Sequence, residues 1–110
     1  MLARFFYFKK TYAMKTITVV ATFQAQPGKE AELQKALVSL VAPTRQEAGC
    51  LNYDLHVSPA DPGKFLFHEN WTTKAALDLH LQSPHIQVLL PRTNELCIGM
   101  PDIVVWEKLA

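Results

Sequence analysis

The chain has 110 residues, with 11 basic and 10 acidic side chains and a formal net charge of +1. This length suits one domain, and a balanced charge without a basic stripe argues against a nucleic-acid partner. Cys50 and Cys97 lie far apart, without the spacing of a disulfide framework or a zinc site, so the chain is expected to be cytoplasmic.

The first 14 residues, MLARFFYFKKTYAM, are predicted to form an extension upstream of a domain that spans residues 15–110. Lys9 and Lys10 cut the aromatic run to four residues. That run is too short for a secretory signal or a membrane span, so no membrane association is expected. The alternative is an aromatic arm that docks on the fold or on a partner subunit.

The alternating β-branched residues of 16–25 predict a first strand, which Pro27-Gly28 ends. Apolar residues at helical spacing then predict a helix from residue 29 to about residue 47. Pro43 is expected to bend this helix near its end, and Gly49 closes it.

Residues 51–57 and 64–71 predict two strands joined by the turn-rich SPADPG, and residues 102–109 predict a last strand. A short helix is expected over residues 74–82, capped by Thr72 or Thr73. After it, Ser83 as N-cap and Pro84 at the first helical position predict a second helix that runs to about residue 97.

The order β-α-β-β-α-β predicts an α+β, ferredoxin-like fold with one antiparallel sheet and the helices on one of its faces. Strand alternation places both apolar and polar residues on the uncovered face: Thr18, Val20, Thr22, Asn52, Asp54, His56, Leu66, His68 and Asn70. A homodimer that packs sheet to sheet would cover such a face, and His56 and His68 are then interface residues.

The same alternation turns Phe65, Phe67, Glu69 and Trp71 of the third strand toward the helices, where Tyr53 and Ala21 of the neighbouring strands also point. A carboxylate buried in this aromatic layer is costly unless it has a partner. We expect its partner to be an imidazole on the next helix.

His80 follows Ala76 by four residues, so the two share a helix face, and Leu77 lies in the adjacent row. This spacing predicts a cavity between sheet and helix, with His80 and Glu69 as its polar groups, typical of a small-molecule site. His85, in the first helical turn after Pro84, is expected at the rim, where the helix dipole disfavours its charged form.

Purely structural roles are the alternative for each of these residues. His80 would be an ordinary helix histidine bonded to a backbone carbonyl or to water, and His85 would be a capping or interface residue. Glu69 would make a structural hydrogen bond, and Trp71 would be a core residue. We expect no metal site, because the histidines lack i, i+4 spacing and no carboxylate completes a ligand set. Phosphate loops and nucleophile elbows are also missing, which leaves acid–base chemistry on a confined substrate.

Three segments, PGKEAELQKAL, EAGCLNYDLH and FLFHENWTTKAALDLHLQSPH, resemble the antibiotic biosynthesis monooxygenase family of small dimeric α+β-barrel proteins. The resemblance runs from about residue 15 to residue 109. Its most specific part is E-x-W followed by A-x-x-x-H-x-x-S-P-H, from Glu69 to His85. It implies a homodimer whose sheets face each other, with one pocket per subunit.

Groups within this family differ at positions that this chain can be compared with. Where haem degraders carry asparagine, tryptophan and histidine, this chain has Ala21, His80 and Leu90. The polyketide oxygenases carry an asparagine, a tryptophan and a tyrosine. At these positions the chain has Phe67, Trp71 and Leu77, so it keeps only the tryptophan. The quinol monooxygenase group keeps the E-x-W, the helix histidine and the S/T-P-H, as this chain does.

The leading hypothesis is a cofactor-independent monooxygenase that oxidises a small quinol-like or phenolic aromatic, with dioxygen as co-substrate. The predicted substrate-binding residues are Trp71, Tyr53, Phe67, Ala21 and Leu77. His80 is the expected general base, Glu69 orients it, and His85 assists from the rim. The alternatives are an isomerase or proton-transfer enzyme on a small carbonyl or sugar-derived metabolite, and a dimer that only binds a small ligand.

Overall fold

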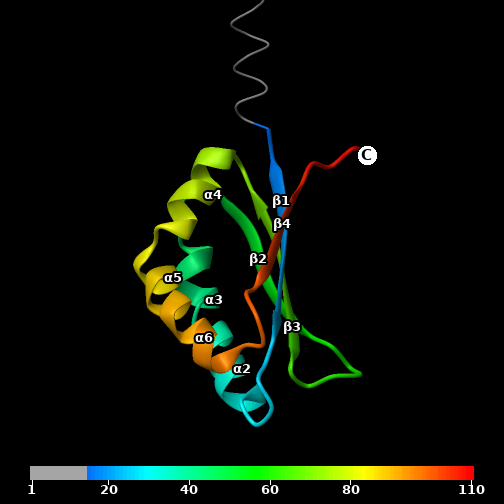
Figure 1. Ribbon diagram of the computed structural model, residues 1–110. Coiled ribbons are helices and arrows are strands. Elements are labelled where there is room, and N and C mark those ends of the chain that lie inside the picture. The colour runs from blue at the N-terminus through cyan, green and yellow to red at the C-terminus, as the bar shows by residue number, and fades with distance from the viewer. Residues whose placement is uncertain (1–14) are drawn as a thin grey trace, which may run out of the picture.

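The computed structural model describes residues 15–110, so the predicted extension over residues 1–14 lies outside the described residues. Four strands form one antiparallel sheet in the order β2-β3-β1-β4: β1 (Ile17–Gln24), β2 (Cys50–Val57), β3 (Lys64–Trp71) and β4 (Asp102–Trp106). All the helices of the described residues lie on one side of this sheet (Figure 1). The predicted ferredoxin-like α+β fold is therefore confirmed.

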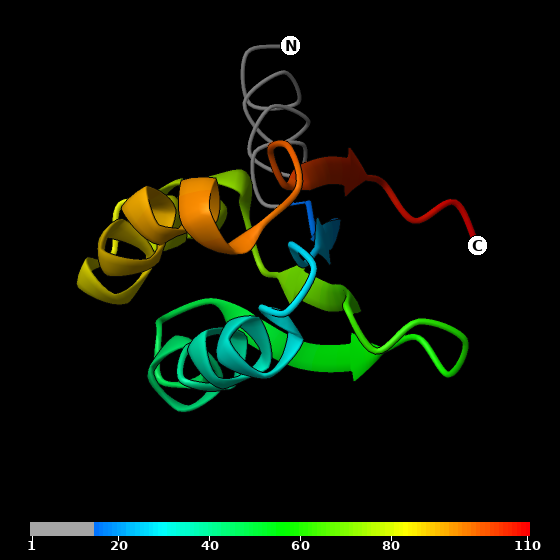
Figure 2. The same cartoon turned by 60° about the horizontal axis from the view of Figure 1, so that its bottom comes forward.

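The helices form two groups that lie next to each other over the sheet (Figure 2). One contains α2 (Glu30–Val38) and α3 (Val41–Arg45), and the other contains α4 (Lys74–Leu81), α5 (Pro84–Leu89), the 3-10 turn η1 (Leu90–Arg92) and α6 (Thr93–Leu96). None of these helices is long and apolar enough to cross a membrane.

Proline explains two departures from the predicted helices. The expected helix over residues 29–47 is two helices, and Pro43 lies in the first turn of the second, where its missing N–H costs nothing. Near the end of the chain, Pro91 lies in a 3-10 turn that separates α5 from α6, so the expected helix to residue 97 is also divided. The last strand ends at Trp106, three residues earlier than predicted.

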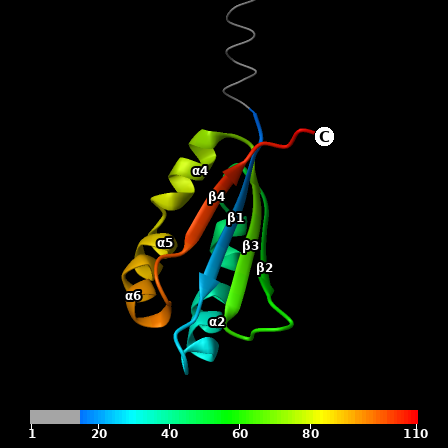
Figure 3. The ribbon, with the colours of Figure 1, turned by 45° about the vertical axis from the view of Figure 1, so that its right-hand side comes forward.

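Strand alternation sets which side chains face the helices, as predicted. In β1, Val19, Ala21 and Phe23 are buried, and in β3 the buried positions are Phe65, Phe67, Glu69 and Trp71. These residues, with Tyr53 of β2 and apolar residues of the helices, make one core between the sheet and the helices. The strands and the helices behind them can be followed in Figure 3.

The other face of the sheet carries a chain of hydrogen-bonded polar side chains. Thr18 donates to Asn70 (2.6 Å), Asn70 donates to Asn52 (2.7 Å), and Asn52 donates to Asp54 (3.0 Å). On this face Trp106 of the edge strand β4, which is paired with Thr18, is 56% exposed in the single chain, and Val20 and Val104 are partly exposed. This face therefore combines polar groups that already have partners with apolar surface that does not.

Candidate active site

A cavity of about 300 Å³ lies between the sheet and the helices, lined almost entirely by apolar side chains. Six of the predicted site residues line it: Ala21, Tyr53, Phe67, Glu69, Leu77 and His80. Trp71 and His85 are not among its lining residues. The wall is completed by helix residues such as Leu81, Ile86 and Leu89, and by Pro101 and Ile103 next to and within β4.

Aromatic side chains of the sheet pack around His80 and hold it in place. Tyr53 and Phe67 stack with their ring centroids 4.4 Å apart. The His80 ring packs edge-on against Tyr53 at 5.3 Å and lies at 4.7 Å from the ring of Trp71. His80 is 2% exposed, so these contacts fix the plane of its imidazole.

Trp71 itself is fully buried beneath His80, and its indole Nε1–H donates to Oε1 of Glu69 at 2.9 Å. The two residues are neighbours on one face of β3, two positions apart. Trp71 was predicted to stack on a substrate, but its place behind His80 makes it a support for the imidazole.

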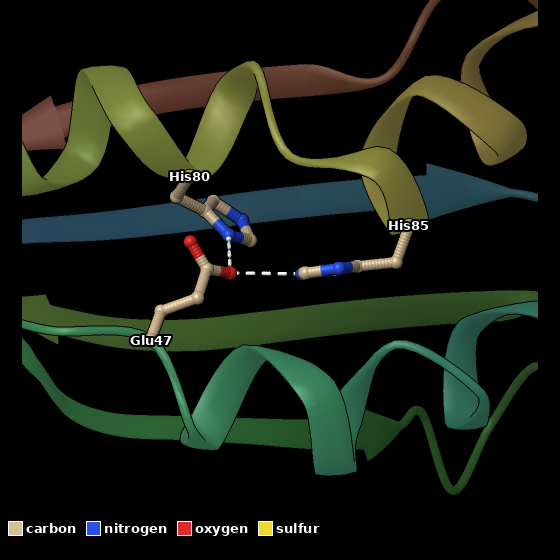
Figure 4. Close-up of side chains that lie close together, drawn as sticks. All are labelled: Glu47, His80 and His85. Carbon is tan, nitrogen blue, oxygen red and sulfur yellow. Dashed lines mark hydrogen bonds and ion pairs between the residues drawn. The ribbon is translucent and has the colours of Figure 1, made fainter.

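The predicted contact between Glu69 and His80 is replaced by a different pairing. The carboxylate at His80 is Glu47, whose Oε2 lies 2.7 Å from the ring Nδ1 (Figure 4). The same oxygen lies 2.8 Å from Nε2 of His85. Glu69 instead has Trp71 as its partner, so the predicted contact between Glu69 and His80 is not formed, and the carboxylate bonded to His80 is that of Glu47.

Glu47 comes from the turn between α3 and β2, beyond the helix in which the sequence had placed it. Its N–H donates to the carbonyl of Thr44 (3.0 Å), and its carbonyl accepts from Cys50 (3.2 Å). Gly49 closes the turn with φ of +85°. Glu47 and His80 are 33 residues apart on separate elements. The EAG segment before the strand signals a turn, but nothing in it indicates the direction of the side chain.

Ser83, just before α5, and Pro84, its first residue, hold the two histidines close to Glu47. The Ser83 hydroxyl donates to the carbonyl of His80 at 2.6 Å, so Ser83 tightens the end of α4 and makes no side-chain cap for α5. Pro84 occupies the first turn of α5, as predicted, and His85 follows it.

The Thr73 hydroxyl caps α4 by accepting from the N–H of Ala76 (3.1 Å).

Hydrogen bonding determines which nitrogen of His80 can act in the cavity. An ionised carboxylate only accepts hydrogen bonds, so Glu47 favours the tautomer of His80 with its proton on Nδ1. Nε2 then carries the lone pair, on a ring that lines the cavity. Burial lowers the pKa of His80, and nearby His85 lowers it further, although Glu47 opposes both. The imidazole is therefore neutral at pH 7 and able to accept a proton.

The other polar group of the cavity is Glu69, which is 4% exposed. Burial raises its pKa to about 7, the hydrogen bond from Trp71 opposes that rise, and the charge of Glu47 adds to it. Burial also raises the pKa of the Tyr53 phenol, which keeps its proton. The cavity therefore presents a neutral base and a carboxyl group that changes charge near neutral pH.

The substitution Glu69→Gln is expected to stabilise the protein at alkaline pH. Because the folded pKa of Glu69 exceeds the ordinary value of 4.5, its contribution to stability is complete below about pH 4.5 and is lost as the pH rises through 7. The neutral amide keeps an acceptor for Trp71 and avoids the buried charge. Urea denaturation at pH 5 and pH 9 should show the variant gaining up to about 3 kcal/mol over the wild type between them. An equal difference at both pH values would contradict a raised pKa for Glu69.

Glu47, His80 and His85 are also residue types that bind metal ions, and their ligand atoms lie within 4.8 Å of one another. No carboxylate was expected to complete a ligand set, but Glu47, from a distant turn, does join the two histidines. The distances of 2.7 and 2.8 Å are those of hydrogen bonds, which satisfy these groups without an ion. We therefore treat the cluster as a hydrogen-bonded triad.

Both cysteines are free, Cys50 at the start of β2 and Cys97 in the core. Burial raises the pKa of each thiol, and at Cys50 the nearby charges of Glu47 and Glu69 raise it further. A thiol of this kind is a poor nucleophile, so neither cysteine is a candidate for covalent catalysis.

Comparisons with known proteins identify the class to which this fold and site belong. The family model described as antibiotic biosynthesis monooxygenase matches residues 16–91. The chain belongs to the antibiotic biosynthesis monooxygenase family.

Relatives in sequence include "Putative monooxygenase Rv0793" of Mycobacterium tuberculosis, 39% identical over 84% of this chain and 91% of the relative. An uncharacterised protein of Synechocystis sp. is 28% identical over 83% of this chain, which spans 62% of that longer relative. Among solved structures, PA3566 of Pseudomonas aeruginosa has a TM-score of 0.84 at 36% identity, covering 89% of this chain and 98% of the other. The structure of Rv0793 has a TM-score of 0.82, covering 87% of this chain and 97% of the other.

Proposed function

We propose that this protein is a cofactor-independent monooxygenase of small quinol-like or phenolic aromatics, with dioxygen as co-substrate. The observation that carries the proposal is the His80 imidazole, which lines an apolar cavity while Glu47 is hydrogen-bonded to its Nδ1. Monooxygenase is the activity in the names of the family and of the Mycobacterium relative. An apolar cavity of about 300 Å³ is at the small end of ligand sites, which suits one or two aromatic rings.

In this mechanism the phenol lies against Tyr53 and Phe67 with its hydroxyl at Nε2 of His80. The imidazole takes the phenolic proton, and the resulting anion is electron-rich enough to transfer one electron to dioxygen. The two radicals combine at a ring carbon, and the peroxide loses water to leave a carbonyl. The substrate loses the hydrogen atoms of one ring C–H and one O–H group. One oxygen atom of O₂ enters the quinone, and the other enters water. The Glu69 carboxyl, when protonated, donates a hydrogen bond to an oxygen of the substrate.

A panel of quinols and phenols, followed with an oxygen electrode, tests this proposal. Oxygen uptake in proportion to quinone formation, undiminished in protein treated with a chelator, is the expected result. A substrate that is converted without oxygen uptake would refute the oxygenase.

A second function, proton transfer on a small carbonyl compound, is favoured by one specific observation. Glu69 and His80 line the same cavity, one as an acid and the other as a base near neutral pH. Such a pair can move a proton between two atoms of a substrate without dioxygen. Conversion under argon would identify this function, and tight binding of a quinone without conversion would identify a binding protein.

The proposal includes a homodimer formed through the uncovered face of the sheet. The polar side chains of this face already have partners in Thr18, Asn52 and Asn70, so burying them costs little. Trp106 of β4, which lies on this face and is 56% exposed, would gain cover from a second subunit. Sedimentation equilibrium gives the mass in solution, and a monomer at micromolar concentration would refute the dimer.

A further inference from the structure

We propose that Glu47 is the positioning residue of His80, and that His85 tunes His80 as a base by sharing the same carboxylate oxygen. This inference rests on the proposed function only in taking His80 as the group that accepts a proton. It assigns roles to Glu47 and His85 that explain why two histidines, one buried and one near the surface, converge on a single acceptor.

The geometry joins the three side chains through one atom. Oε2 of Glu47 lies 2.7 Å from Nδ1 of His80 and 2.8 Å from Nε2 of His85, and the two imidazole centroids are 6.1 Å apart (Figure 4). The side chain of His80 is 3% exposed and that of His85 is 20% exposed. His85 is therefore partly accessible to solvent, whereas His80 lines the cavity.

The three side chains come from separate elements that the backbone holds in fixed places. Glu47 lies in a hydrogen-bonded turn, His80 in the last turn of α4, and His85 in the first turn of α5. Gln82 and Ser83 alone separate α4 from α5, and Ser83 bonds to the carbonyl of His80 through both its N–H and its hydroxyl. These contacts restrict movement of the three side chains, so we expect them to respond to pH by a change in charge and not by a change in position.

The sharing of one oxygen couples the two imidazoles. When His80 accepts a proton from the substrate, the negative charge of Glu47 stabilises the imidazolium. A proton on His85 draws on that same charge and places a second positive charge near His80, so both effects make His80 a weaker base. When His85 is neutral, the negative charge of Glu47 stabilises the His80 imidazolium alone, and His80 is a stronger base.

The other titratable groups near the triad do not duplicate this effect. Tyr53, against the His80 ring, and Cys50, at the start of β2, keep their protons near pH 7 because burial raises the pKa of each. Glu69 lines the same cavity as His80 and changes charge near pH 7, but it is hydrogen-bonded to Trp71 and not to the triad. Among the described residues, the charges that shift the pKa of His80 are those of Glu47 and His85.

The experiment follows the titration of His80 itself by ¹⁵N-correlated NMR of the imidazoles in the full chain. The variants are Glu47→Gln, which removes the charge but keeps the shape, and His85→Gln, which keeps a donor near the position of Nε2 but cannot be protonated. Glu95→Gln, at an exposed carboxylate of α6, is the matched control. Thermal unfolding of each variant verifies that it is folded.

The expected shifts have opposite signs. Glu47→Gln should lower the pH at which His80 titrates and reduce its population with the proton on Nδ1, and His85→Gln should raise that pH. In the double variant the effect of His85→Gln should shrink, because the shared charge has gone. The control should match the wild type. An unchanged titration of His80 in either single variant, or full additivity in the double variant, would overturn the proposal.

Turnover gives a separate readout. If a substrate is found, kcat/KM of Glu47→Gln should fall about 10- to 100-fold, as for residues that orient a reacting group. The acidic limb of its pH profile should move to lower pH, and that of His85→Gln to higher pH. If the titrations of His80 and His85 are coupled but no substrate is oxidised, the proposed function is refuted and this inference stands. If a substrate is oxidised but the two titrations are independent, this inference is refuted and the proposed function stands.

Discussion

The substitution His80→Ala is expected to lower turnover of an accepted phenolic substrate about 10²- to 10⁴-fold, the usual contribution of a general base. His80 is the histidine that lines the cavity, and its hydrogen bond to Glu47 through Nδ1 leaves Nε2 free. The loss should appear mainly in kcat, because Tyr53 and Phe67 still contact the aromatic ring. Steady-state kinetics by oxygen uptake and by product absorbance measure it.

The fold of this variant is expected to survive, because Glu47 keeps His85 as a hydrogen-bond partner. Leu79→Ala is the matched control, since Leu79 precedes His80 on α4 and is 67% exposed. It should retain the activity of the wild type. Undiminished turnover in folded His80→Ala would show that another group takes the proton.

The substitution Gly49→Ala is expected to destabilise the protein by about 3 kcal/mol or more. Gly49 has φ of +85°, a conformation that costs a residue with a side chain about 1–2 kcal/mol. An added Cβ would also lie 2.5 Å from Cβ of Ala76 and 2.7 Å from the Thr72 hydroxyl, so the turn or α4 must shift. Thermal unfolding should show a melting temperature lower by more than about 10 °C.

Gly28→Ala separates the two causes. Gly28 has nearly the same φ, +84°, but a Cβ there meets no atom within 4 Å. It should therefore show the backbone cost alone, about 1–2 kcal/mol. Equal losses in the two variants would mean that Gly49 is not packed tightly against α4.

The part of the fold that depends on local sequence could be predicted. Alternation along β1 and β3 shows which residues face the helices, because successive side chains of a strand point to opposite faces. The i, i+4 spacing of Ala76 and His80 likewise put the imidazole on the face that looks toward the sheet. Both patterns act within one element, so one sequence is enough to recognise them.

The partners within the site could not be predicted in the same way. Glu69 was expected to meet His80, yet it bonds to Trp71, two residues along its own strand. Glu47 was expected in a helix, but it reaches His80 from a turn whose position depends on how α3 packs beside β2. Contacts between distant elements depend on the exact crossing of those elements, and periodicity carries no information about it.

The place of Trp71 gives this protein an optical reporter of its own. The chain has two tryptophans, and the other, Trp106, is 56% exposed on the edge strand. Trp71 touches the imidazole and the carboxyl that line the cavity, so its emission is expected to change with their protonation and with the binding of a ligand beside them. With Trp106 replaced by phenylalanine, the remaining fluorescence would monitor occupancy of the cavity without a label.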